Sequence, residues 1–246
     1  MKKIISSFII VCFLILGNNQ ADAQVSISLG AKAGLSIPNL KSKGDNPLDK
    51  GWESRSGLYA GLMADINLSE NFAISTELNF SSQGGKRTGA QAIPNPNNPP
   101  IPAYLYADFK NIAVINYAEV PLMATYKFGS SSNVHIVVQA GVYGGFLLRA
   151  KNVSSGNSII YLDEQLTIPV TADPENFDHT TNIKDDIKSF NYGIQGGAGV
   201  SFDLPSGSLR IMAGGNYGLT TIQKDQANGN DHTGALTLTV GYLFNL

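Results

Sequence analysis

The chain has 246 residues and a formal net charge of −2 at pH 7. Because 17 basic residues nearly balance 19 acidic ones, the chain has no basic footprint for nucleic acid phosphates, and we expect no nucleic acid partner. Its 26 glycines exceed the usual share of about 7%. Many of them lie inside alternating segments, which favours a curved sheet over helices.

The first residues have the pattern of a secretory signal peptide. Lys2 and Lys3 precede an apolar run over residues 4–16, and Ala21-Asp-Ala23 has the small-x-small form of a cleavage site. The run is shorter than the roughly twenty residues that a membrane-spanning helix requires. We therefore predict a signal peptide at residues 1–23 and one barrel domain at residues 24–246. The only cysteine would leave with the signal peptide, so no disulfide or thiolate chemistry is expected.

Eight segments of the mature chain alternate between bulky apolar residues and small or polar ones. Successive side chains of a strand point to opposite faces, so each segment would have one apolar face and one polar face. The apolar faces are nearly free of charge, as contact with lipid requires. The predicted strands are residues 25–37, 58–68, 72–81, 112–128, 134–151, 190–203, 209–219 and 236–246.

The connections between these segments alternate strictly in length. Those after the second, fourth and sixth strands are a few residues long, whereas the other four are long and polar. Outer-membrane barrels have short periplasmic turns and longer outer loops. The sequence therefore predicts an all-β fold, an eight-stranded antiparallel up-and-down transmembrane β-barrel in the outer membrane of a Gram-negative bacterium. The long outer loops are residues 38–55, 84–110, 152–188 and 222–232.

Aromatic residues on the apolar faces fall into two groups about one membrane crossing apart. Outer-membrane barrels carry such aromatic belts at both interfaces, and a soluble β-sandwich, whose strands would also alternate, gives no reason for them. The belt at the short-turn ends comprises Phe72, Tyr126, Phe128, Phe202, Tyr242 and Phe244, and the belt at the outer ends comprises Phe80, Phe146, Phe190, Tyr192 and Tyr217.

Several motifs resemble one family. The most specific is Asn116-Tyr-Ala-Glu-Val-Pro-Leu122, followed by Tyr126-Lys-Phe128, and glycine-rich strand motifs such as Gly141-Val-Tyr-Gly144 accompany it. Over residues 24–246 the chain resembles the outer-membrane β-barrel domain of PorT-like proteins, common in Bacteroidota. The resemblance implies an eight-stranded barrel but no single role, because one member is associated with protein secretion and most are named only as porin-like.

Charges of both signs fall on the inward parity of the strands. An eight-stranded barrel has an interior just wide enough for side chains to fill, and buried charges persist only when they are paired and hydrogen-bonded. We therefore predict a plug of ion pairs rather than an open pore, with a proton or ion relay as the alternative. Glu119 is the best candidate for a lumen anchor. The predicted lumen charge cluster comprises Lys32, Asp65, Glu77, Glu119, Lys127, Arg149 and Arg210, and Lys151 and Asp203 share its parity.

Catalytic and metal-binding patterns are weak. His135, His179 and His232 lack the short spacing of a metal site, and no Ser-His-acid grouping can be singled out. We therefore expect no enzymatic activity, no metal and no cofactor.

The outer loops are the candidate place for function, because binding residues concentrate on loops held by a rigid scaffold. The second loop contains a proline-rich stretch at residues 92–102, flanked by Tyr104 and Tyr106, and Trp52 lies in the first loop. These three aromatics are predicted to form an exposed recognition surface, although the stretch could equally cap the sheet without a partner.

These observations predict a non-enzymatic integral outer-membrane barrel with a filled lumen, acting through its outer loops in envelope structure or surface recognition. Its predicted partners are outer-membrane lipid and envelope or secretion proteins. Two alternatives remain open. One is a small porin-like transport channel, and the other is a subunit of a protein-secretion machinery.

Overall fold

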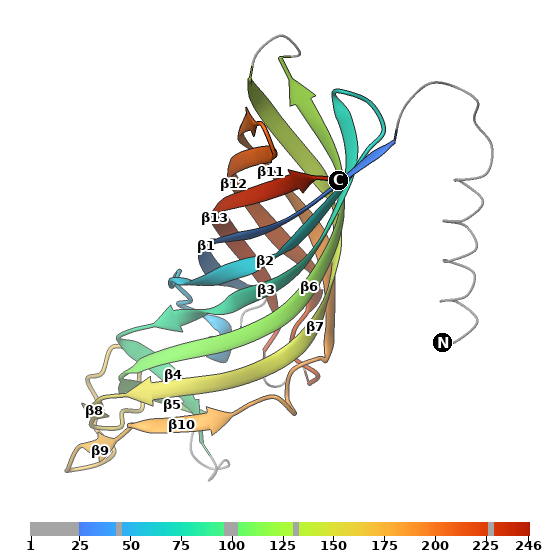
Figure 1. The fold of residues 1–246 in the computed structure, drawn as a ribbon. Coiled ribbons are helices and arrows are strands. Elements are labelled where there is room, and N and C mark those ends of the chain that lie inside the picture. Colours follow the sequence, from blue (N-terminus) through green and yellow to red (C-terminus); the bar gives the residue numbers. More distant parts are fainter. Residues whose placement is uncertain (1–24, 43–45, 96–102, 130–132, 226–228) are drawn as a thin grey trace, which may run out of the picture.

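A computed structural model describes residues 25–42, 46–95, 103–129, 133–225 and 229–246. The predicted signal peptide and most of the proline-rich stretch lie outside the described residues. No helix among the described residues is long and apolar enough to cross a membrane. Eight long strands form the wall of a barrel (Figure 1): β1 (Ser26–Ser42), β2 (Gly57–Asn67), β3 (Phe72–Arg87), β6 (Lys110–Phe128), β7 (Val134–Ser155), β11 (Phe190–Leu204), β12 (Gly207–Thr221) and β13 (Asp231–Asn245).

The eight strands close into an antiparallel up-and-down ring. Each strand pairs with the next one in the wall, β6 pairs with β7, and β13 returns to β1 from Ser28↔Asn245 to Ser42↔Asp231. The seam needs close contact between backbones, because a Cβ on Gly34 would lie 1.9 Å from the Leu238 carbonyl oxygen. The predicted eight-stranded antiparallel fold is confirmed.

The predicted facing of the strands is confirmed over the membrane crossing. Apolar side chains on the outward parity are exposed, for example Leu62 at 62% and Val142 at 58%. Side chains on the inward parity are buried, for example Tyr59 and Met123, each at 1%. The barrel is thus apolar outside and largely polar inside, the reverse of a soluble domain, because its outer surface contacts lipid.

The strands extend beyond the outer aromatic belt. β3 continues to Arg87 and β7 to Ser155, several residues past their predicted ends. The apolar alternation stops where the strands leave the lipid, but the backbone pairing continues because the neighbouring strands extend as well. The short elements beyond the wall are the 3₁₀ turn η1 (Pro47–Asp49) and the strands β4 (Ala90–Pro94), β5 (Tyr104–Asp108), β8 (Asn157–Ser158), β9 (Glu175–Asn176) and β10 (His179–Asn182). In Figure 1 β4, β5, β8, β9 and β10 gather at the end of the barrel opposite the C-terminus.

A β-bulge in β7 reverses the facing of its outer end. Asn116 of β6 pairs with Arg149, whereas the next residue, Tyr117, pairs with Leu147. Leu148 is therefore the extra residue, and after it Ala150 is buried at 1% while Arg149 is exposed. The prediction that Arg149 and Lys151 point into the lumen is wrong, because a bulge adds one residue to the period of two.

The facing can be tested with two alanines on the outer surface. Ala140, near the middle of the crossing, pairs with Ala124 and Gly196, whereas Ala118 pairs with Phe80 and Phe146 of the outer belt. Ala140→Arg should lower the free energy of unfolding by about 2–4 kcal/mol and Ala118→Arg by about 0–1 kcal/mol, because the cost of a lipid-facing cation falls toward the interface. Urea titrations in lipid vesicles measure both values. Equal costs would contradict the assigned depth and facing.

Candidate functional site at the outer end of the barrel

Two buried ion pairs cross the lumen. Lys32 Nζ lies 2.6 Å from Glu77 Oε2, and Arg210 Nη2 lies 2.8 Å from Asp65 Oδ2. Each carboxylate also accepts a hydrogen bond from a neutral side chain. Asn79 Nδ2 donates to Glu77 at 2.7 Å, and Ser75 Oγ donates to Asp65 at 2.6 Å. All four charged side chains are buried. The structure therefore brings together four of the seven residues of the predicted cluster as two hydrogen-bonded ion pairs.

Glu119 is held by amides instead of a cation. Its side chain is 1% exposed and accepts hydrogen bonds from Gln83 Nε2 at 3.3 Å and Asn216 Nδ2 at 3.2 Å. Among the described residues no lysine or arginine forms an ion pair with it. Glu119 is thus anchored in the lumen, but through a polar network that joins β3, β6 and β12.

The remaining two members of the predicted cluster lie elsewhere. Lys127 is half-buried at the periplasmic mouth, where it lines an open recess together with Asp203. Arg149 is on the outer wall, beyond the bulge. The alternating pattern correctly predicts that Lys127 faces inward. The pattern does not predict how far along the barrel axis a side chain lies, and therefore which other charged side chains it can contact.

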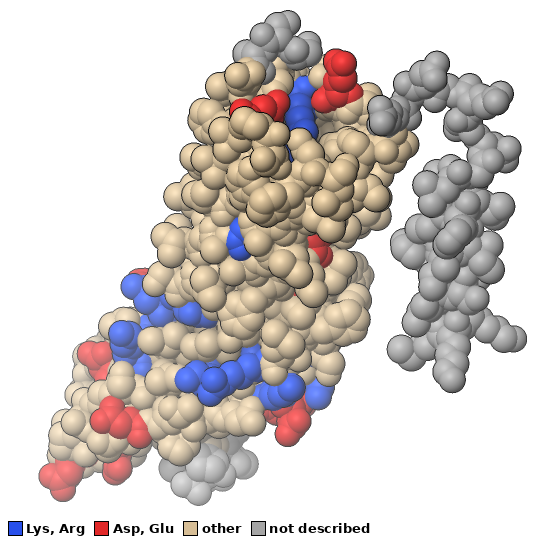
Figure 2. Space-filling model, in the orientation of Figure 1, with Lys and Arg blue, Asp and Glu red and all other residues tan. Residues whose placement is uncertain are grey.

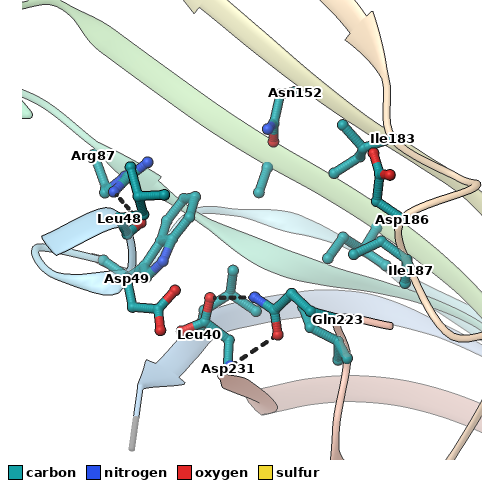
Figure 3. A pocket seen from close by; sticks show the side chains of 14 residues that line it. Leu40, Leu48, Asp49, Arg87, Asn152, Ile183, Asp186, Ile187, Gln223 and Asp231 are labelled. Atoms are coloured by element: carbon teal, nitrogen blue, oxygen red, sulfur yellow. Dashed lines mark hydrogen bonds between the residues drawn. The ribbon is translucent and has the colours of Figure 1, made fainter. Parts of the chain in front are cut away.

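A cavity of about 250 Å³ lies at the outer mouth of the barrel, above the lumen network. Its floor belongs to a buried apolar cluster that includes Leu40, Ile115, Ile187 and Ile222. The strands β1, β3, β6, β7 and β13 and the outer loops contribute to it, and the carboxylates of Asp49 and Asp231 lie across it from that of Asp186 (Figure 3). The lining residues are Leu40, Leu48, Asp49, Trp52, Arg87, Ala113, Ile115, Asn152, Ile183, Asp186, Ile187, Ile222, Gln223 and Asp231.

Trp52 is part of this cavity and not of an exposed loop surface. The Arg87 guanidinium lies 4.3 Å from the centre of the Trp52 ring, a cation–π contact. Arg87 Nη1 also donates a hydrogen bond of 2.7 Å to the Leu48 carbonyl, which ties the first outer loop to β3. The expected grouping of Trp52 with Tyr104 and Tyr106 is therefore wrong, because Trp52 packs into the mouth where Arg87 ends β3.

The electrostatics of the cavity centre on Asp231. Gln223 Nε2 donates to Asp231 Oδ2 at 2.8 Å, and the Asp231 amide donates to Gln223 Oε1 at 2.9 Å. Asp49, 2% exposed, accepts from the Asn230 amide at 2.7 Å. Burial and the nearby Asp49 carboxylate raise the pKa of Asp231 to about 7, against smaller opposing effects of Gln223, Arg87 and Trp52. The cavity thus combines an apolar floor with a carboxyl group that titrates near neutral pH.

Tyr104 and Tyr106 belong to a small sheet formed by two outer loops. β5 pairs with β4, and the amides and carbonyls of Tyr106 and Tyr161 exchange two hydrogen bonds of 2.8 Å. Further bonds join Leu162 to Ile168 and Val170 to Ile160. We call this assembly the loop sheet, defined by β4, β5 and residues 160–162 and 168–170.

One face of the loop sheet is aliphatic. The aliphatic residues alternate along the chain with the bridged residues Tyr106, Tyr161 and Pro169. Their side chains therefore lie on the face of the loop sheet opposite to the side chains of those three residues. Ile168 is 52% exposed and Val170 is 48% exposed. The sequence shows the alternation of residues 160–162 and 168–170, but no pattern in the sequence predicts that the second outer loop pairs with the third. The aliphatic face consists of Ile93, Leu105, Ile160, Leu162, Ile168 and Val170.

The histidines do not form a metal site. Among the described residues, no group of three or more His, Cys, Asp or Glu side chains could hold a metal ion. His232 lies in β13 and stacks on Tyr217, with ring centroids 5.9 Å apart. His135 Nε2 lies 2.9 Å from Asp203 Oδ2 at the periplasmic end.

Stability should depend on pH through Asp231. Its pKa is about 7 in the folded protein and about 3.9 when unfolded. Between these values the folded state retains a proton that the unfolded state releases, so the free energy of unfolding falls as pH rises from about 4 to about 7. Asp231→Asn should flatten this slope in urea titrations at several pH values, whereas the exposed control Glu164→Gln should keep it. A wild-type slope in Asp231→Asn would refute the assignment.

Comparisons with known proteins agree with the barrel. The family model described as outer membrane protein beta-barrel domain matches residues 20–224. Neisserial surface protein A is similar, with 15% identity, a TM-score of 0.37 and coverage of 87% of this chain and 96% of that one. The attachment invasion locus protein Ail of Yersinia pestis has 14% identity, a TM-score of 0.36 and coverage of 88% and 98%.

The outer membrane protease OmpT from Escherichia coli has 9% identity, a TM-score of 0.40 and coverage of 94% and 99%. No curated protein sequence gives a significant match. Since the family model covers most of the chain, this protein belongs to the outer membrane protein beta-barrel domain family and resides in the outer membrane of a Gram-negative bacterium.

Proposed function

We propose that this protein is a non-enzymatic outer-membrane barrel with a filled lumen, and that its outer loops recognise another envelope or surface protein. The observation that carries this proposal is the aliphatic face of the loop sheet. Exposed apolar patches rimmed by polar residues are typical of protein interaction sites. Ile168 and Val170 are about half exposed. They lie among the outer loops, beyond the lipid-facing wall, so contact with lipid does not account for their exposure.

The loop sheet is attached firmly enough to present such a surface. Phe109, which precedes β6, stacks on Phe177 with ring centroids 4.5 Å apart. Ser158 Oγ accepts a hydrogen bond of 2.9 Å from the Asp108 amide, and the Phe177 amide donates to the Gly156 carbonyl at 2.8 Å. These contacts tie the second and third outer loops to each other and to the outer ends of β6 and β7. A rigid scaffold reduces the entropy lost when a partner binds.

The absence of an enzymatic role is also part of this proposal. Ser201 pairs with His135 across β11 and β7, and Asp203 contacts the same histidine. The Ser201 hydroxyl is fully buried, however, and has no hydrogen-bond partner within the part of the chain that the structure describes. A nucleophile must reach both its base and a substrate, so this grouping does not favour hydrolysis.

The recognition function can be tested with a photo-crosslinking amino acid on intact cells. Placed at Val170, it should capture a discrete protein, and the added substitution Ile168→Asp should abolish the capture by charging the aliphatic face. The same amino acid at Glu175, an exposed position in β9, is the matched control and should capture nothing. Capture from Glu70 in a periplasmic turn, but not from Val170, would contradict surface recognition and favour the secretion-machinery alternative.

Two findings disfavour the alternative of a transport channel. The lumen is crossed by the Lys32–Glu77 and Arg210–Asp65 pairs, and the fully buried Gln83 and Glu119 lie above them. A solute would have to break several hydrogen bonds in a low dielectric to pass. Within the family we also propose that the chain is PorT-like, on the residues 116–122 that β6 contains. A role in secretion rests on that resemblance alone.

Purified wild-type barrel should show no stable open conductance in planar bilayers at neutral pH. Large steady currents from the wild type would reject the filled lumen and support the channel alternative.

Glu77→Gln should lower the free energy of unfolding by about 3–5 kcal/mol because it leaves the buried Lys32 ammonium uncompensated. Asp203→Asn removes the exposed partner of His135 and should lower the free energy of unfolding by less than about 1 kcal/mol.

A further inference from the structure

The outer end of β7 presents two cations on the lipid-facing wall. Because the bulge at Leu148 reverses the facing of the strand, Arg149 is exposed, and Lys151 follows it opposite Val114. Without the extra residue, both side chains would point into the lumen. Bulges that re-aim side chains are typical of functional positions in sheets.

Lys184, in the segment between β10 and β11, joins them. Its Nζ donates a hydrogen bond of 3.0 Å to the Leu148 carbonyl, so this ammonium lies beside the bulge. Lys188 of the same segment points elsewhere, because its Nζ donates a hydrogen bond of 2.6 Å to Thr221 Oγ1 of β12. Among the described residues neither Arg149 nor Lys151 nor Lys184 forms an ion pair with a carboxylate. We call Arg149, Lys151 and Lys184 the basic patch.

The basic patch borders the outer aromatic belt. Phe146 and Phe190 pack with ring centroids 5.1 Å apart, and Tyr192 lies 6.5 Å from Phe190. All three are exposed to the lipid side. Arg149 and Lys151 follow Phe146 along β7, and Lys184 precedes β11 in the chain, so these cations lie on the side of the belt away from the membrane centre. Acyl chains against the rings would therefore place their headgroups at the cations.

In the described part of the chain, outward-facing cations are confined to the outer half of the barrel. In Figure 2 the wall between the two ends is nearly free of charge, and Lys and Arg gather toward the end that carries the loops. Among the described residues, the basic side chains nearer the periplasm are Lys32, Lys127 and Arg210, and all three have inward parity. The asymmetry matches an anionic surface on the outer leaflet, because juxtamembrane cations are attracted to anionic headgroups.

We propose that the basic patch binds the phosphate groups of a phosphorylated outer-leaflet lipid, whose acyl chains lie along Phe146, Phe190 and Tyr192. The Arg149 guanidinium can bind a phosphate through two parallel hydrogen bonds, and the Lys151 and Lys184 ammonium groups supply point charges near it. A soluble acidic protein fits less well, because the patch lies at the boundary of the lipid-facing surface. This site is separate from the loop sheet and does not depend on the recognition function.

The test is native mass spectrometry of the mature barrel in detergent micelles, titrated with bisphosphorylated lipid A and with the same lipid after dephosphorylation. The wild type should bind the phosphorylated lipid at least about tenfold more tightly. The double variant Arg149→Gln with Lys151→Gln should lose that preference. The matched double variant Lys41→Gln with Lys86→Gln, on β1 and β3, removes the same charge and should keep it.

Two results would overturn the proposal. Equal weakening by both double variants would mean diffuse attraction by the net charge, and equal binding of the two lipids by the wild type would mean that the phosphates are not recognised. Lys184→Gln tests the same site outside the barrel strands, so a folding defect of the β7 variant does not decide the outcome. This single variant should also weaken the preference for the phosphorylated lipid, and full retention of that preference would refute the patch.

Discussion

Every backbone amide and carbonyl inside the hydrocarbon layer must find its partner within the protein, because lipid offers none. The pairing of β1 with β13 meets this requirement at the seam, and it joins the two ends of the described chain over the full height of the wall. Glycine at position 34 permits the close contact that this pairing needs. Once the ring is closed, the outward faces must be apolar and the polar side chains have only the interior to occupy.

Closure with eight strands then determines the character of the interior. The lumen is narrow enough for side chains to fill, so the charged groups that point inward need ion-pair or hydrogen-bond partners. Lys32 meets Glu77, and Arg210 meets Asp65 across 145 positions of sequence. Asn79 and Ser75 donate further hydrogen bonds to Glu77 and Asp65. Gln83 and Asn216 donate to Glu119. A barrel filled in this way is a rigid support, and its chemistry is left to its two ends.

The outer end is the more elaborate one because the strands continue past the lipid. Their extensions enclose an apolar cavity with a titratable carboxyl group, hold the loop sheet away from the membrane, and present cations beside the outer aromatic belt. In the roles proposed above, these three features face different surroundings: the solvent above the mouth, a protein partner, and the lipid headgroups. The proposed lipid site and the proposed protein site are therefore separate surfaces of one scaffold.

The sequence by itself determined the strands, their facing and the order of short and long connections. It could do so because the bilayer acts on each strand separately, and a period of two is a local property. The tertiary structure alone decided the features that depend on a neighbouring strand or loop. Arg149 points outward because of a bulge that is defined only against β6, and Glu119 finds amides because β3 and β12 bring Gln83 and Asn216 to its depth. Tyr106 meets Tyr161 and Trp52 meets Arg87 for the same reason: such contacts depend on how distant segments fold over one another, which no local period encodes.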